Sequence, residues 1–402
     1  MYVIITPMKI AVIAPPWLKT YPGCYYGIEN VIQALVSSLY KKGHEVVLFG
    51  VAGSKTECSK LYYYHDKEQY SNVHRAWYES VPVVSSHILY ALNIISSHAD
   101  FDIIHDHNSF LGPAMMAFAY GNLPPVLHTL HEPFTNQKLI KRNIPDNRHL
   151  FQELVHAHGM YFNGISKSQL STAPKDFNYK ILDIIPNGVD LDDYHFLKEK
   201  GDYFLNVGRI SNDKGQADGA RFAAELGVPF KCAGTVGGGI ATYEVAEAEM
   251  EHPSDLSVGN PEVAYYRDEL RPYLKKGRIE YLGAVYGKEK LDLIANAKAF
   301  LAPIHWEEPF GISILDALAS GTPVVAYRRG AFPEIIEHGR NGFLADNESQ
   351  FKEYMMRVDE IDPVECRKSV EENFSATVMA DRYEELYSRV IETHRARRKI
   401  RI

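Results

Sequence analysis

The sequence predicts an α/β protein built from two doubly wound parallel sheets. Short apolar runs alternate with segments whose apolar residues recur at helical spacing, and this alternation occurs in both halves of the chain. The 402 residues are 46% hydrophobic and 23% charged, which suffices for two soluble domains of ordinary size. Because such folds bind ligands at the carboxyl ends of their strands, we expect the two domains to face each other across a ligand-binding cleft.

The first half opens with an apolar run at residues 9–14 and a loop rich in Pro, Gly and Tyr. Residues 29–42 place apolar side chains on one helical face, and Gly43 ends this helix before a strand at residues 45–49. The result is a βαβ unit. Further strands are expected at residues 103–105, 126–130 and 161–165.

The second half repeats the scheme, with a helix at residues 216–226. Its strands are expected at residues 203–207, 230–234, 279–282, 299–302 and 323–326. Turn residues at 185–190 indicate the boundary, so the predicted domains are 1–185, 186–377 and a terminal helix with a basic tail at 378–402. Residues 235–259 are interpreted as an insertion without an assigned role.

Composition excludes several classes of protein. The net charge of −8, with no aromatic-interleaved basic segment, argues against nucleic acid as a partner. The four cysteines are far apart and form no C-x-x-C pair, which argues against a zinc site or a disulfide framework and favours the cytoplasm. No run of 18 to 20 apolar residues is present. The basic tail at residues 395–402 is either simply solvated or a peripheral contact with an anionic membrane surface.

The segment at residues 306–324 joins an acidic loop to a helix. Pro309 and Gly311 mark the turn, and Gly311 lets the backbone approach a ligand closely. The first N–H groups of the helix and its dipole form a seat for a diphosphate or for sugar hydroxyls. Glu308 and Asp316 then accept hydrogen bonds from hydroxyls at two places on one ligand. A turn with surface acids before a buried helix is the simpler alternative.

A second constellation follows the strand at residues 203–207. Gly208 ends this strand, and Arg209 and Lys214 lie just beyond its carboxyl end, where α/β folds bind ligands. Two cations there suit a diphosphate leaving group, whose negative charge grows as its bond to the sugar breaks. A surface Arg and Lys beside a turn is the alternative.

Together these segments resemble the retaining GT-B glycosyltransferases, in particular glycosyltransferase family 4, over most of residues 8–390. Glu308 matches the first position of the E-x7-E signature, which in the family faces the transferred sugar, and Asp316 stands where a glutamate normally holds the nucleotide ribose. Arg209 and Lys214 match the G-R-x-x-x-x-K-G motif, whose cations neutralise the donor diphosphate. The resemblance also implies substrate-binding positions at Pro309, Phe310, Gly311, Ile312 and Ser313.

In the first half, residues 25–29 resemble the family's Y-G-G-x-E loop, with Tyr26 in place of the first glycine. We expect Gly23 to provide the close approach to the phosphate and Gly27 to line the substrate. Glu29 either binds acceptor hydroxyls or caps its helix.

Histidines lie near two strand ends of the first half. His105 and His107 share one face of a strand, which leaves a metal site as one interpretation. The resemblance implies instead that no metal is required, since Arg209 and Lys214 already balance the diphosphate. His131 matches a family histidine beside the transferred sugar, and His107 is a second candidate for the same cleft.

The chain is therefore interpreted as a retaining hexosyltransferase that uses no cofactor. UDP-glucose is the expected donor and GDP-mannose the alternative, and the acceptor is an unidentified hydroxyl on a sugar, a small molecule or a lipid-linked glycan. The resemblance implies that the acceptor attacks on the same face and that the departing phosphate oxygen takes the acceptor's proton. The rival functions are a catalytically weak nucleotide-sugar-binding protein of the same fold, because Asp316 replaces a glutamate, and an oxidoreductase, which the missing G-x-G-x-x-G disfavours.

Overall fold

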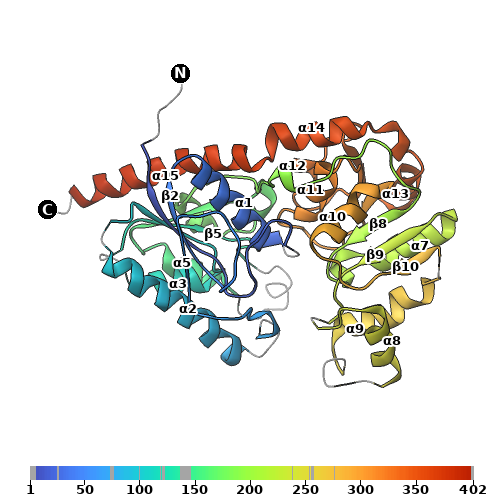
Figure 1. Cartoon of the computed structure of the whole chain (residues 1–402), viewed down its shortest axis with the longest axis horizontal. Helices are drawn as coiled ribbons and strands as arrows, with labels where there is room; N and C mark the ends of the chain where they lie inside the picture. Colours follow the sequence, from blue (N-terminus) through green and yellow to red (C-terminus); the bar gives the residue numbers. More distant parts are fainter. Residues whose placement is uncertain are drawn as a thin grey trace. The chain divides into compact units, whose positions relative to one another are not determined.

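The computed structural model describes residues 6–24, 27–72, 77–98, 100–117, 119, 123–135, 146–237, 239–252, 254, 258–275 and 277–399. The chain divides into two compact units (Figure 1). Unit 1 comprises Met1–Val189 together with Ser375–Ile402, and unit 2 comprises Asp190–Phe374.

Unit 1 is built on a seven-stranded sheet in the order β3-β2-β1-β4-β5-β6-β7, in which every pairing is parallel. The strands are β1 (Lys9–Ile13), β2 (Glu45–Gly50), β3 (Lys60–Tyr63), β4 (Ile103–Asp106), β5 (Val126–Thr129), β6 (Met160–Gly164) and β7 (Ile181–Ile184). The strand order reverses between β1 and β4, so the ligand site of such a sheet lies where these two strands end.

Helices cover this sheet because each buries an apolar stripe. In α1 (Gly27–Lys41) apolar side chains recur every three or four residues, and Val31, Leu35 and Leu39 are fully or almost fully buried. The other helices of unit 1 before the junction are α2 (Trp77–Ser97), α3 (Leu111–Met116), α5 (Arg148–Leu154) and α6 (Lys167–Leu170).

Helix α2 carries a single charged residue, Glu79. Within the described residues, Glu79–Ser97 is the one stretch long and apolar enough to cross a membrane by length and composition, with a mean hydropathy of 1.2. A third of that window is buried, and the buried side includes Val84, Ile88 and Ile95 in the core against β1. A core helix of a globular unit passes the same test.

The last helix, α15 (Ala376–Lys399), belongs to unit 1 and packs against α1 (Figure 1). Glu384 of α15 bonds the His44 imidazole at 2.6 Å and forms an ion pair with Lys42 at 2.9 Å. Deeper in the unit, the Tyr387 hydroxyl lies 2.7 Å from Nδ1 of His105, and Nδ2 of Asn163 donates to the Tyr383 hydroxyl at 3.1 Å. The end of the chain thus completes the polar interior of its first half.

Unit 2 has a six-stranded parallel sheet in the order β10-β9-β8-β11-β12-β13. The strands are β8 (Phe204–Val207), β9 (Phe230–Ala233), β10 (Ile279–Tyr281), β11 (Ala299–Ala302), β12 (Val324–Tyr327) and β13 (Gly342–Ala345). The helices are α7 (Gln216–Leu226), α8 (Tyr243–Glu251), α9 (Pro261–Tyr265), α10 (Gly287–Asn296), α11 (Ile312–Ala319), α12 (Phe332–Ile335), α13 (Glu348–Met355) and α14 (Pro363–Asn373). Here the order reverses between β8 and β11.

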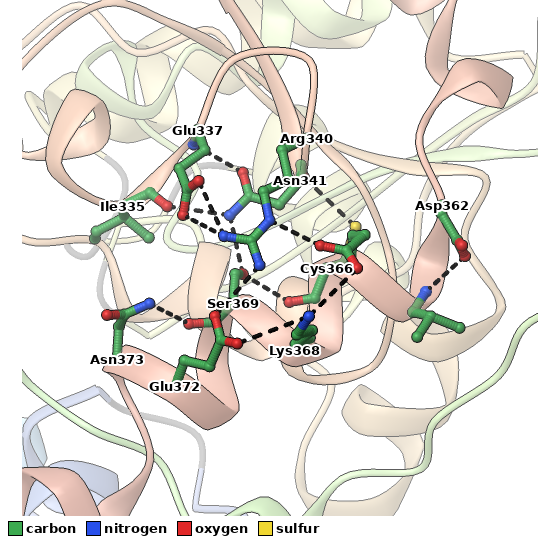
Figure 2. Close-up of polar contacts among 12 residues, drawn as sticks. Ile335, Glu337, Arg340, Asn341, Asp362, Cys366, Lys368, Ser369, Glu372 and Asn373 are labelled. Carbon is green, nitrogen blue, oxygen red and sulfur yellow. Dashed lines mark hydrogen bonds and ion pairs between the residues drawn. The ribbon is translucent and has the colours of Figure 1, made fainter.

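A polar network fastens α14 to the turn before β13 (Figure 2). The Arg340 guanidinium contacts Glu337 at 2.9 Å, Glu365 at 2.8 Å and Glu372 at 3.3 Å. Beneath it, Nδ2 of the buried Asn341 donates to the Ser369 hydroxyl at 2.9 Å. The network therefore holds the far edge of the unit 2 sheet, away from the strand-order reversal.

The predicted α/β fold class is confirmed by these two doubly wound parallel sheets. Predicted strands overlap β1, β2, β4, β5, β6 and β8 to β12, and the predicted helix at 216–226 has the bounds of α7. The strands β3, β7 and β13 were not predicted. β3 and β7 are edge strands with partly exposed side chains and lack the buried apolar run on which such predictions depend.

Candidate functional site

The turn from β8 to α7 carries both predicted cations of unit 2. It starts at Gly208 and ends at Gly215, whose φ of 72° lies in the left-handed region. A Cβ on Gly215 would lie 2.0 Å from the carbonyl oxygen of Pro303, which follows β11. Only glycine permits this approach, so the turn passes directly against the segment after β11.

This approach brings Lys214 to Glu308, although the two lie 94 positions apart in the chain. The Lys214 ammonium is 2.5 Å from Oε2 of Glu308, and it lies 5.2 Å from the centroid of the Trp306 ring. The Trp306 indole N–H donates to the same Glu308 oxygen at 3.1 Å. Glu308 is only 8% exposed, so its carboxylate is held by two donors on a partly desolvated surface.

Arg209, the other predicted cation, forms an ion pair with Glu262 of α9. Sequence reasoning assigned no role to Glu262, which lies just beyond the predicted insertion. The sequence around it, Asn260-Pro261-Glu262, is typical of a helix start, with Asn260 as the N-cap accepting the Glu262 N–H at 3.0 Å. Such a signal predicts the helix and not the ion pair.

The loop before α11 has the predicted geometry of a helix start. Gly311 is the N-cap residue with a φ of 99°, and no side chain of the described residues caps this helix. A Cβ on Gly311 would lie 2.5 Å from the Phe332 ring. Phe310 is buried, whereas Ile312 and Ser313 in the first turn of α11 are partly exposed. Pro309, next to Glu308, is buried as well.

Asp316 lies one turn further along α11 and is buried, with its side chain 3% exposed. Its Oδ1 accepts from the Tyr194 hydroxyl at 2.6 Å, and its Oδ2 lies 2.9 Å from the Lys290 ammonium. Neither Tyr194 nor Lys290 was singled out from the sequence, because each comes from a distant segment. The structure thus places Asp316 in a buried ion pair behind the loop that carries Glu308.

In unit 1 the predicted histidines gather where β4 and β5 end. Nδ1 of His107 lies 3.0 Å from Nε2 of His131, and the His105 and His107 rings are 4.1 Å apart between centroids. His105 is bonded through its other nitrogen to the Thr129 hydroxyl at 2.7 Å. Among the described residues, Nε2 of His107 and Nδ1 of His131 have no hydrogen-bond partner although both atoms are buried.

Burial keeps these imidazoles neutral. It lowers the pKa of His131 to about 4 and holds the pKa of His105 and of His107 well below the ordinary value of 6.5, with neighbouring imidazoles adding to the effect at His105 and His107. Among the described residues, no group of three or more His, Cys, Asp or Glu side chains has the arrangement of a metal site.

The predicted glycines of unit 1 follow β1. Gly23 is buried with a φ of 71°, and Gly27 is the first residue of α1. Tyr25 and Tyr26, on which the loop resemblance partly rests, lie outside the described residues. Glu29 is buried, and desolvation raises its pKa to about 7.

A cavity of about 730 Å³ lies at the opposite, amino-terminal edge of the unit 2 sheet. Lys198, Lys200 and Lys298 contribute to its lining, and none of the predicted site residues does. The Lys200 ammonium is already bonded to the carbonyls of Ala295 and Ser320, each at 2.9 Å. This cavity is therefore separate from the cations after β8.

Comparisons with known proteins bear on the family and the fold. Two family models match the chain: "Glycosyltransferase Family 4" over residues 25–193 and "Glycosyl transferases group 1" over residues 191–374. Spore coat protein SA of Bacillus subtilis is 27% identical over 120 residues, or 28% of this chain and 32% of that protein. The phosphatidyl-myo-inositol mannosyltransferase of Mycobacterium tuberculosis is 24% identical over 257 residues, or 62% of this chain and 60% of that enzyme.

The chain thus spans less than two thirds of either relative. Among solved structures, Anabaena HepE in complex with UDP-glucose superposes with a TM-score of 0.66 at 16% identity, covering 95% of this chain and 99% of that one. At this identity the likeness bears on the fold alone, and it confirms the GT-B expectation.

Proposed function

The chain belongs to the glycosyltransferases of group 1 and family 4, and on that premise we propose that it moves a hexose from a nucleoside diphosphate sugar to an acceptor hydroxyl. The observation that carries this proposal is the ion pair between Lys214 and Glu308, which follow the neighbouring strands β8 and β11 at the reversal in strand order. A cation for phosphate and a carboxylate for sugar hydroxyls there match the two ends of one donor molecule.

On the donor side, Arg209 and Lys214 are proposed to neutralise the diphosphate. Negative charge grows on the diphosphate as the glycosidic bond breaks, so fixed cations stabilise the transition state more than the bound substrate. Glu308 accepts hydrogen bonds from the transferred sugar, and the loop and helix start from Pro309 to Ser313 line the donor. Their backbone N–H groups and the α11 dipole favour an anion.

Asp316 is proposed to accept a hydrogen bond from the nucleotide ribose. Tyr194 and Lys290 occupy one site on each carboxylate oxygen, but an ionised carboxylate has about four acceptor sites in all. The ion pair with Lys290 would then orient the carboxylate. The Asp316 side chain is one methylene shorter than the glutamate that the family has at this position.

The reaction is proposed to retain configuration and to need neither metal nor cofactor. The bond from the sugar C1 to the phosphate oxygen breaks, a bond from C1 to the acceptor oxygen forms on the same face, and the acceptor proton passes to the departing phosphate oxygen. Arg209 and Lys214 supply the charge that a metal ion supplies in other enzymes. UDP-glucose is the favoured donor and GDP-mannose the alternative, as the resemblance to the family implies.

The carboxyl edge of the unit 1 sheet is assigned to the acceptor. Gly23 and Gly27 follow β1, and the neutral His107 and His131 offer donors and acceptors without charge, which suits hydroxyl groups. The acceptor itself is identified only as a hydroxyl compound. All four cysteines are free, which supports a cytoplasmic location.

Acceptor-free hydrolysis of a panel of nucleotide sugars tests the function, because slow release of nucleoside diphosphate identifies the donor. Lys214→Ala and Arg209→Ala should each lower kcat at least about tenfold, since each removes charge stabilisation from the transition state. Lys352→Ala is the matched control, since Lys352 pairs with Glu225 and Glu348 on the surface and should leave kcat unchanged. Full turnover in both site variants would contradict the assigned diphosphate site.

A nucleotide-sugar-binding protein that kept the fold but lost turnover is the second candidate, favoured by the buried pairing of Asp316 with Lys290. It would bind UDP tightly in calorimetry and release no nucleoside diphosphate from any donor in the panel. Turnover of a single donor rules it out.

A further inference from the structure

Helix α9 is attached to the turn that carries both cations. The Tyr265 hydroxyl accepts a hydrogen bond from the Ala217 N–H, in the first turn of α7, at 2.8 Å. N–H groups in the first turn of a helix lack intrahelical partners, so the Tyr265 hydroxyl takes the place that a ligand oxygen could occupy at the Ala217 N–H. The helix is therefore fastened to the first turn of α7, directly after the turn that carries both cations.

The segment leading to α9 is equally constrained. Gly237 has a φ of 60°, and a Cβ there would lie 2.8 Å from both the Asn260 amide nitrogen and the Val263 side chain. Asn260 donates to the Gly237 carbonyl at 3.2 Å and caps α9 with its side-chain oxygen. Val263 is 3% exposed within the unit core. Glu262 thus projects from a packed helix and not from a loose loop.

Each predicted diphosphate cation has its own carboxylate partner in the structure. Lys214 pairs with Glu308, and Arg209 pairs with Glu262. The Arg209 side chain is 43% exposed and that of Glu262 15%, so the guanidinium is accessible from solvent while its carboxylate partner is largely covered. An arriving anion can reach Arg209 without displacing α9.

We propose that Glu262 is a built-in counter-ion of Arg209 that weakens the hold of unit 2 on nucleoside diphosphates. This inference rests on the proposed function and extends it to product release. A diphosphate bound to Arg209 stays near the Glu262 carboxylate, and like charges repel. Removing that single negative charge makes the local charge one unit more positive, so an anion binds more tightly. The carboxylate thereby favours release of the nucleoside diphosphate after the sugar has left.

The test measures binding of UDP and of inorganic pyrophosphate by calorimetry to the full-length chain. Glu262→Gln keeps an acceptor for Arg209 and the backbone that Asn260 caps, but it removes the charge. We expect both ligands to bind about three- to fivefold more tightly, as for a partly exposed charge pair. Glu262→Asp keeps the charge and should bind both ligands as the unmodified chain does.

Two further variants isolate the effect. Glu247→Gln is the matched control, because Glu247 lies on α8 and pairs with Arg271 and Tyr266 away from Arg209, so its affinities should not change. In an Arg209→Ala background, Glu262→Gln should lose most of its effect on affinity. The proposed role of Glu262 is wrong if Glu262→Gln binds pyrophosphate no more tightly than the unmodified chain while its thermal melt is the same.

Pyrophosphate separates this inference from the proposed function. If UDP binds no better than pyrophosphate to any variant, the nucleotide assignment fails while a tighter hold on pyrophosphate by Glu262→Gln still supports the counter-ion. If neither the unmodified chain nor Glu262→Gln binds pyrophosphate, the counter-ion fails too, since a guanidinium freed of its carboxylate has to hold that anion.

Discussion

The carboxyl edges of the two sheets carry different polar groups, although the two sheets have similar topologies. In unit 1, His105, His107 and His131 lie at the edge as buried neutral rings. In unit 2, the corresponding edge holds the ion pairs Lys214–Glu308 and Arg209–Glu262. One doubly wound framework thus presents buried imidazoles beside the buried pair Asp106–His128 at one edge, and the ion pairs of Lys214 and Arg209 at the other. Strand order determines where a ligand binds, and the residues after each strand determine what it is.

Breaking the buried ion pair between Lys290 and Asp316 in unit 2 should have the largest effect on the free energy of unfolding. Lys290→Met leaves the Asp316 carboxylate buried without its cation, which should cost about 3–5 kcal/mol of unfolding free energy in a urea titration. The double variant Lys290→Met with Asp316→Leu should recover most of that loss. Lys288→Met, at an exposed neighbour paired with Asp292, should cost less than about 1 kcal/mol. Equal losses at positions 288 and 290 would contradict the buried pair.

Acid should weaken the unit 1 edge. The His131 pKa is about 4 in the folded chain against an ordinary 6.5, so the unfolded chain takes up a proton in that interval and the folded chain does not. The contribution of neutral His131 to the free energy of unfolding is therefore fully present above pH 6.5, and it is lost as the pH is lowered toward 4. His131→Gln should flatten the dependence of unfolding free energy on pH by up to one proton, or roughly 1.4 kcal/mol per pH unit. Urea titrations at a series of pH values from 7.5 to 4.5 measure this. The same change of unfolding free energy with pH in both proteins would refute the prediction.

The smallest expected effect concerns the neutral network behind the histidines. Tyr387→Phe removes the hydroxyl that contacts His105 and should lower the unfolding free energy by about 1 kcal/mol. Tyr179→Phe is the control, because its hydroxyl bonds the Val155 carbonyl from a ring that is 62% exposed. Its loss should stay below about 0.5 kcal/mol. A control as damaging as Tyr387→Phe would show that burial of the network matters little.

Buried regularity explains how much of the fold was predictable. β1 and β8 are short, mostly apolar runs that are almost fully buried. Helix α7 lies between two glycines and buries Ala220, Phe222 and Ala223. These elements were therefore found almost to the residue. β3, with partly exposed tyrosines at the sheet edge, offers no such contrast. β13 is as short as β8, but it begins with a glycine, so that only three apolar side chains mark it in the sequence.

The candidate site was predictable where topology alone brings residues together. Lys214 and Glu308 follow strands on either side of the reversal in strand order, so parallel pairing places them at one edge. The partners Glu262, Lys290 and Tyr194 come from segments whose positions depend on side-chain packing. No local pattern in the sequence specifies such contacts.

The placement of α15 in unit 1 affects the order in which the two units can be completed during synthesis. Domains generally fold as they emerge during synthesis, first segments first. Here the ribosome completes Asp190–Phe374, the whole of unit 2, before it produces the tyrosines that contact His105 and Asn163. The unit that begins the chain is therefore the last to be finished, and a nascent chain halted at Phe374 would carry a complete unit 2 and an unfinished unit 1.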